Sequence, residues 1–266
     1  MLNHQRRETV GRLARFSDSS EESYARLRQG NTPFPSVANS PIVPATTSQL
    51  EELFGRWRLR YAKTDGHFVS DGNIGSDEDW WQTPVRVLFL TKEAHDFEGF
   101  DHDLRKLFRT FRQLKQKKPH FEYNVGRWAY GLHCSAEIES PLFAAADEPR
   151  NRHSALLRSA VVNLKKIAGS ETANPAELGR SVRQDGDLIR EQIGILNPDV
   201  VACGGTWKLA NSLIRGLRLS KPYSVDRANG RIWLSCFHPT LQGMNPQNHF
   251  SQIVNLYRNS LAAPSP

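Results

Sequence analysis

The sequence contains few cysteines and no long apolar run, and each absence excludes a class of protein. Its three cysteines, Cys134, Cys203 and Cys236, are far apart and odd in number, so neither a disulfide framework nor a CxxC metal site is present. No run of about 18 apolar residues is available to span a membrane, and the opening residues lack the apolar stretch of a signal peptide. We therefore expect a soluble, cytoplasmic protein in a reducing compartment, with no membrane partner.

Apolar content and charge indicate the size of the fold and a first class of partner. Of the 266 residues, 38% are hydrophobic and 24% are charged, which suits one large globular domain or two small ones. Lysine and arginine number 35 against 28 for aspartate and glutamate, so the net charge is +7 and the isoelectric point is near 9.5. This excess of positive charge makes a polyanion the first partner to consider.

The first part of the chain differs in composition from the rest. Residues 1–28 are charged and contain helical stretches, whereas residues 29–47 carry four prolines, each of which removes a backbone hydrogen-bond donor. The prolines predict a long loop that wraps the domain. A helix is expected to begin near Thr47 and Ser48, because apolar residues then recur at helical spacing, namely Leu50, Leu53, Phe54 and Trp57.

Four segments predict strands, and three of them are short apolar runs of the kind buried on both faces: residues 85–90, 160–164, 198–204 and 231–237. Helical patterns lie between them at residues 104–114 and 188–196, and another helix is expected after Gly204-Gly205-Thr206. Strands that alternate with helices indicate an α/β fold. We expect a three-layer sandwich in which helices flank a central, largely parallel sheet.

Polar side chains follow each of these predicted strands, and in a parallel sheet ligands bind outside the carboxyl ends of the strands. Residues 91–96 follow the first strand, and Asn163 lies at the end of the second. The turn Gly204-Gly205-Thr206 follows the third strand, and residues 238–240 follow the fourth. A carboxylate, an amide, a glycine turn and a histidine at neighbouring strand ends form a plausible site for splitting a polar bond in an anionic ligand.

Each of these residues also has a simpler interpretation, which the sequence leaves open. Glu93 can be a surface salt-bridge residue, and Asn163 can be a helix cap or turn residue. Gly204 and Gly205 can form an ordinary strand-to-helix turn, and His238 can be a loop histidine bonded to the backbone. The functional hypothesis therefore depends on the four positions as a set.

The order and spacing of these motifs resemble the uracil-DNA glycosylase superfamily of α/β DNA repair enzymes. VLFLTKEAHD is similar to its first motif, with Glu93 at the place of the water-positioning acid. Asn163 in VVNLKK matches the asparagine that reads the base edge, and FHPT, which contains His238, is similar to the last motif, His-Pro-Ser. The stretch at 188–214 also resembles the superfamily's helix, strand, glycine turn and helix between the last two motifs.

The resemblance divides the chain into three parts. It covers residues 85–258 and implies a uracil-DNA glycosylase-like α/β domain there. Residues 1–84 are left as an N-terminal addition of helices and a wrapping loop, and residues 259–266 are left as a tail.

The resemblance implies a role for each motif. An enzyme acting on a base in DNA must flip the nucleotide out of the duplex, because the reactive sugar carbon is inaccessible in the base stack. His238 is then the donor to the departing base, and Glu93 orients or deprotonates the attacking water, with Asp96 as the second choice. Asn163 would hydrogen-bond the pairing edge of the base, and its amide suits cytosine-like and uracil-like edges.

Several positions depart from the family's pattern. Thr91 and Ala94 replace its glycine and proline, and His95 stands where the strict uracil enzymes place a tyrosine that excludes substituents at the pyrimidine 5 position. The missing tyrosine suggests a 5-substituted pyrimidine rather than uracil, whereas Thr91 and Ala94 favour a noncatalytic module of the same fold. Phe97 or Phe100 is the expected aromatic platform for the base, with core packing as the alternative. The four cysteines of the iron-sulfur branches are missing, so neither a metal nor another cofactor is expected.

DNA contacts are expected around these motifs. Leu241 and Met244 follow the last motif, where the superfamily has a loop that probes the duplex, and they are candidates to wedge into the vacated base space. A basic run at 105–118 suits a phosphate backbone, with a solvated helix face as the simpler interpretation. The expected DNA-binding residues are Lys92, Arg105, Lys106, Arg109, Arg112, Gly204, Gly205, Thr206, Thr240, Leu241 and Met244.

The leading hypothesis is a DNA glycosylase that excises a modified pyrimidine from double- or single-stranded DNA and leaves an abasic site. One setting is defence against phages whose DNA carries hypermodified cytosine, such as glucosylated hydroxymethylcytosine, and the rival setting is repair of uracil or damaged bases. A noncatalytic DNA-binding module of the same fold is the alternative from another class. A small-molecule nucleotide enzyme ranks last, because the Gly204-Gly205 turn lacks the lysine and spacing of a P-loop.

Overall fold

The computed structural model describes residues 44–262, except residues 65, 98, 111–119, 136–140, 170–171, 242 and 244. The predictions for residues 1–43, which include most of the proline-rich loop, lie outside the described residues. The same holds for Arg112 and Met244.

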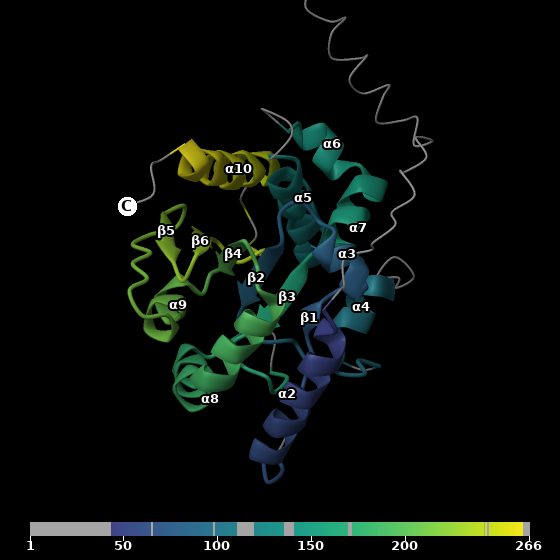
Figure 1. Cartoon of the computed structure of the whole chain (residues 1–266), viewed down its shortest axis with the longest axis vertical. Helices are drawn as coiled ribbons and strands as arrows, with labels where there is room; N and C mark the ends of the chain where they lie inside the picture. The colour runs from purple at the N-terminus through teal and green to yellow at the C-terminus, as the bar shows by residue number, and fades with distance from the viewer. Residues whose placement is uncertain are drawn as a thin grey trace, which may run out of the picture. The chain divides into compact units, whose positions relative to one another are not determined.

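A mixed six-stranded sheet forms the centre of the fold, in the order β1-β3-β2-β4-β6-β5 (Figure 1). The strands are β1 (Gly72–Asn73), β2 (Val87–Thr91), β3 (Ala160–Asn163), β4 (Val200–Gly204), β5 (Val225–Ala228) and β6 (Arg231–Cys236). The inner strands β3, β2, β4 and β6 pair in parallel, and β1 and β5 pair antiparallel at the edges. The four parallel strands are the four predicted ones, and the α/β class is confirmed. The two edge strands were not predicted, because neither contains an apolar run.

Helices cover both faces of the sheet (Figure 1). In β2, Val87 and Phe89 face one apolar core while Leu88 and Leu90 face the other, and all four are fully buried. The first core also contains residues of α4 (Leu104–Thr110), α5 (His120–Cys134), α6 (Phe143–Asp147), α7 (Pro149–Leu157) and α10 (Pro246–Ala262). The second contains residues of α2 (Thr46–Arg60), α3 (Asp77–Trp81), α8 (Pro175–Leu196) and α9 (Trp207–Leu213).

The predicted helices are present, and their bounds differ from the predicted ones. The pattern at 188–196 is the second half of the longer helix α8, which ends at Asn197 in a left-handed conformation with φ of 43°, directly before Pro198. Of the pattern at 104–114, the structure describes the part that forms α4. Within the described part of the chain, no helix has both the length and the apolar character that a bilayer crossing requires.

Elements before residue 85 belong to the same compact unit, which spans residues 43–266. Helix α2 packs against α8 and buries Leu50, Phe54 and Trp57 in the second core. Strand β1 pairs with β3 and so completes one edge of the sheet. Residues 46–84 therefore contribute directly to the fold that the resemblance placed at residues 85–258.

A fully buried ion pair between Asp71 and Lys166 ties four of these segments together. Lys166 Nζ lies 2.6 Å from both carboxylate oxygens of Asp71, and neither residue is exposed to solvent. Asp71 also accepts hydrogen bonds from Gln192 Nε2 of α8 at 2.7 Å and from the backbone N–H of Asn163 at 2.8 Å. Burial lowers the pKa of Lys166, and the Asp71 carboxylate opposes that shift. The Lys166 ammonium also lies 5.0 Å from the ring centroid of Trp57 in α2.

Removing only the cation of this pair should destabilise the fold strongly. Lys166→Met should lower the free energy of unfolding by about 3–5 kcal/mol, because Asp71 is left buried without its partner. Combining it with Asp71→Asn should restore most of the loss, since the pair is then removed as a unit. Urea unfolding followed by circular dichroism measures both variants, with the exposed Lys208→Met as a control. Equal destabilisation in the single and double variants would contradict this account.

Candidate functional site

The carboxyl ends of the four parallel strands lie side by side. Thr91 at the end of β2 pairs with Asn163 at the end of β3, and Gly204 at the end of β4 pairs with Cys236 at the end of β6. Because β2 and β4 are also neighbours, the four ends form one continuous edge. The predicted strand-end segments are therefore brought together at this edge, and they carry Lys92, Glu93, Gly205 and His238.

Asn163 presents a buried amide with one free donor. Its side-chain Oδ1 accepts a hydrogen bond from the Thr91 hydroxyl at 2.6 Å, and the residue is 2% exposed. Its Nδ2 is buried and has no hydrogen-bond partner among the described residues. A buried donor without a partner costs about 1–3 kcal/mol, so this amide is suited to a ligand that brings an acceptor. Asn163 is the last residue of a strand, which excludes the helix-cap interpretation.

His238 lies in a tight turn that fixes which nitrogen carries its proton. The backbone N–H of Leu241 donates to the carbonyl of His238 at 2.9 Å. The backbone N–H of Thr240 donates to His238 Nδ1 at 3.3 Å, and the Thr240 hydroxyl lies 2.7 Å from the same nitrogen. Because Nδ1 accepts, the neutral ring carries its hydrogen on Nε2. Burial, together with the positive charge of Lys92, lowers the pKa of His238 to about 4. At neutral pH the residue is therefore an uncharged donor.

Gly205 allows the glycine turn to approach His238 and Lys92 closely. Its φ is +68°, and a Cβ atom there would lie 3.3 Å from His238 Cβ and 3.5 Å from Lys92 Cε. Lys92 forms no salt bridge with any residue that the structure describes, so its charge is available to an anion beside His238. Thr206 has a different role, since its buried hydroxyl donates to the carbonyl of Leu90 at 2.7 Å.

Glu93 is a buried carboxylate held by a lysine. Its side chain is 4% exposed, and its Oε2 lies 2.5 Å from Lys165 Nζ, which also lies 3.0 Å from Glu177. Burial by itself lowers the pKa of Lys165, but hydrogen bonds to the two carboxylates outweigh it and hold the pKa above its ordinary value. A Cβ atom at Gly169 would collide with the Glu93 carboxyl group. Glu93 is thus in a salt bridge, as the simpler interpretation expected, although it is not on the surface.

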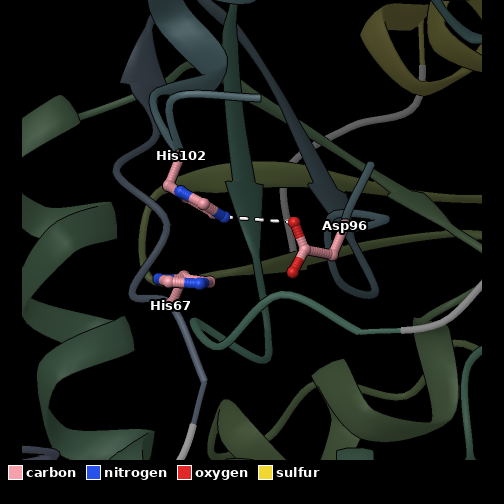
Figure 2. Close-up of side chains that lie close together, drawn as sticks. All are labelled: His67, Asp96 and His102. Carbon is pink, nitrogen blue, oxygen red and sulfur yellow. Dashed lines mark hydrogen bonds and ion pairs between the residues drawn. The ribbon is translucent and has the colours of Figure 1, made fainter. Parts of the chain in front are cut away.

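Asp96 and the expected aromatic platform lie further along the same loop. Asp96 is exposed and pairs with His102 at 3.1 Å between Oδ1 and Nε2 (Figure 2). Phe100 is 6% exposed and belongs to the first core, so it packs as the alternative interpretation expected. Phe97 is partly buried and stacks on Phe100 with ring centroids 5.1 Å apart, while the exposed His95 lies 6.3 Å from the Phe97 ring. Of these residues, His95 and Asp96 are exposed and Phe97 is partly exposed.

The described part of the basic run is engaged within the fold. Arg105 is 8% exposed and pairs with Asp103 at 3.0 Å and with Glu51 of α2 at 2.7 Å. Arg109 donates to the carbonyls of Ile74 and Gly75, and Lys106 pairs with Asp101 at 2.5 Å. These partners lie outside the run itself, so the absence of acids within it did not reveal them. Lys92 at the sheet edge is the better placed cation for a phosphate.

Helix α5 supplies contacts to the histidine turn that the sequence did not indicate. The ring of Phe121 lies 6.0 Å from that of His238 and stacks on Phe108 of α4 at 5.6 Å. Asn124 donates to the carbonyl of Pro239 at 2.6 Å and so anchors the turn. Leu241, which follows, is 43% exposed. The helical spacing of Val125, Trp128, Ala129 and Leu132 could have indicated α5, but no local pattern shows which turn the helix contacts.

The two strand cysteines, Cys203 and Cys236, are not suited to act as thiolate nucleophiles. Burial raises the pKa of Cys236 to about 12 and that of Cys203 well above its ordinary value, so neither thiol is ionised at neutral pH. The remaining groups are a buried carboxylate, a neutral imidazole donor, and an amide donor and a lysine that have no partner in the part of the chain that the structure describes. No protein-family model and no curated protein matches the chain. The interpretation of the site therefore rests on its geometry.

The protonation of His238 is open to direct measurement by long-range ¹H–¹⁵N NMR. We expect an Nε2–H neutral ring at pH 7 that titrates near pH 4. Lys92→Met should raise this pKa, because it removes a repelling charge, yet leave it below the ordinary value of about 6.5, because burial persists. Since the folded chain holds this pKa below the unfolded value, His238 contributes stability above pH 6.5 that is lost as the pH falls toward 4. An unchanged pKa in Lys92→Met would refute the proposed charge effect. Lys208→Met serves as the control, because this exposed lysine is not among the causes of the shift.

Proposed function

We propose that this protein is a DNA glycosylase that hydrolyses the N-glycosidic bond of a flipped, modified pyrimidine. The observation that carries the proposal is the buried, unpartnered Nδ2 of Asn163, which shares its sheet edge with the neutral donor His238 and the buried carboxylate Glu93. A flipped base brings the hydrogen-bond acceptors that such an amide needs. The resemblance to the uracil-DNA glycosylase superfamily assigns the same three residues to the base edge, the departing base and the water.

In the proposed reaction, the carbon–nitrogen bond between sugar and base breaks and its electron pair leaves with the base. The His238 Nε2–H stabilises the negative charge that develops on the base carbonyl, and the neutral ring does so without first losing a proton. A water molecule adds its oxygen to the sugar carbon and passes a proton to Glu93. The Glu93 carboxylate also offsets the positive charge that builds on the sugar, while Lys165 holds it in place.

Asn163 and His95 support a particular class of substrate. Thr91 occupies Oδ1 of Asn163, so the free group is the Nδ2 donor. This donor fits an acceptor such as N3 of cytosine. His95 is exposed, which supports the tolerance of a 5-substituent that its replacement of tyrosine suggests. We therefore propose hypermodified cytosine, such as the glucosylated hydroxymethylcytosine of phage DNA, acted on in the cytoplasm during defence.

Catalysis is tested on DNA that contains glucosylated hydroxymethylcytosine, hydroxymethylcytosine, uracil or plain cytosine, with abasic sites scored by alkaline cleavage. Glu93→Gln should reduce base release by about 10²–10⁴-fold, because the water loses its base. Glu177→Gln is a matched control, since it removes the exposed carboxylate on the same Lys165 and should retain release.

The outcomes separate the competing functions. Release of uracil alone would favour repair over defence. DNA binding that weakens with salt, with no abasic site on any substrate, would replace the enzyme by a noncatalytic DNA-binding module.

The Thr91 hydroxyl is expected to position the reading amide. Thr91→Val keeps the shape of the side chain and removes the hydrogen bond to Asn163, which is worth about 0.5–1.5 kcal/mol. We expect base release to slow by about 2–10-fold, as that energy implies, with an unchanged circular dichroism spectrum. Thr110→Val removes a hydroxyl whose hydrogen bonds to described residues lie within α4, and it should have wild-type release. Wild-type release in Thr91→Val would separate Thr91 from substrate recognition.

A further inference from the structure

Two histidines and an aspartate form a compact cluster beside the loop that follows β2. His67, Asp96 and His102 each offer one ligand atom, and these three atoms all lie within 4.8 Å of one another. Figure 2 shows the two imidazole rings lying one beside the other, with the Asp96 carboxylate facing Nε2 of His102. The rings of His67 and His102 are stacked with centroids 4.2 Å apart.

Backbone hydrogen bonds hold the three residues in place independently of their side chains. The carbonyl of His67 accepts from the N–H of Ala168 at 3.0 Å, and the carbonyl of His102 accepts from the N–H of Ser70 at 2.8 Å. The N–H of Asp96 donates to the carbonyl of Gly169 at 2.9 Å. Three segments that are distant in sequence are thus fastened to one another through residues 70 and 168–169. Such fixed backbones place ligand atoms before a ligand arrives.

The hydrogen bond between Asp96 and His102 does not explain why the His67 ring lies beside them. A simple ion pair needs one imidazole, and here a second imidazole stacks on the first within reach of the same carboxylate. Two imidazole nitrogens and one carboxylate oxygen are the donor set that zinc and related first-row divalent metals prefer. Phe100 contacts the His102 ring at 4.9 Å and supplies an apolar wall, whereas His67 and Asp96 are exposed and leave the other side open.

We propose that His67, Asp96 and His102 bind a divalent transition metal ion of the zinc type, with the remaining coordination positions open to water. The ion joins the segment at residues 67–70 to the loop that carries Glu93, three residues before Asp96 in the sequence. The site does not depend on the proposed glycosylase activity, because the proposed reaction uses Asn163, His238 and Glu93, and Asp96, the second choice for the water-activating acid, takes no part in it. The sequence expectation of a metal-free protein is revised by this proposal.

Metal binding is tested on the full chain after treatment with a chelator and dialysis. Titration with ZnCl₂ in competition with a chromophoric chelator should give one site per chain in the wild type. His67→Ala and His102→Ala should each weaken binding by about tenfold or more. His120→Ala removes an exposed imidazole from the start of α5, remote in sequence from the cluster, and should bind Zn²⁺ as the wild type does.

Thermal unfolding with and without Zn²⁺ is a second measurement, and it separates a loss of metal binding from a loss of stability. Zn²⁺ should raise the thermal midpoint of the wild type, because a ligand that binds only the folded chain stabilises it. Asp96→Asn, a change of nearly equal size at an exposed position, should abolish most of that rise and keep the metal-free midpoint. A Zn²⁺ affinity or midpoint shift in folded cluster variants equal to that of the wild type would overturn the proposal, as would the absence of a site in the wild type.

Discussion

The burial of Asp71 with Lys166 is the constraint on which the sheet edge depends. Two opposite charges removed from water are stable only when each is fully satisfied, and Asp71 accepts hydrogen bonds from three residues, Asn163, Lys166 and Gln192. One of these donors is the backbone N–H of Asn163, so the strand end that carries the buried Asn163 amide is held by the same carboxylate. The segment before β1 and helix α8 are therefore parts of the site, although neither touches a base in the proposed complex.

Two consecutive lysines that follow β3 pair with different carboxylates. Lys166 turns into the core toward Asp71, and Lys165 turns toward Glu93. The third lysine of the site, Lys92, has no carboxylate partner among the described residues, and its charge adds to the effect of burial in lowering the pKa of His238. Positive charge thus holds a carboxylate at one position and opposes protonation of an imidazole at another. The overall excess of basic residues does not reveal either effect, because each depends on the position of a single lysine side chain.

The sequence indicated the four parallel strands and the polar residues that follow them, because an apolar run and its end are local patterns. It did not indicate pairs made between distant segments. Arg105 belonged to a run without acids, yet Glu51 from α2 neutralises it. Asp71 lies in a polar stretch with no motif, and its role depends on Lys166, 95 residues away. The cluster of His67, Asp96 and His102 has no sequence spacing typical of metal sites, since separate loops bring its members together.

The contact between Gly169 and Glu93 has a consequence for how this chain can diverge. Any side chain at position 169 would push the carboxylate out of its place against Lys165. The two loops therefore constrain each other, because a side chain on one must displace the carboxylate on the other. A change of Gly169 is expected together with a shift or a shortening of the side chain at position 93, which ties an ordinary-looking glycine to the position of a carboxylate on another loop.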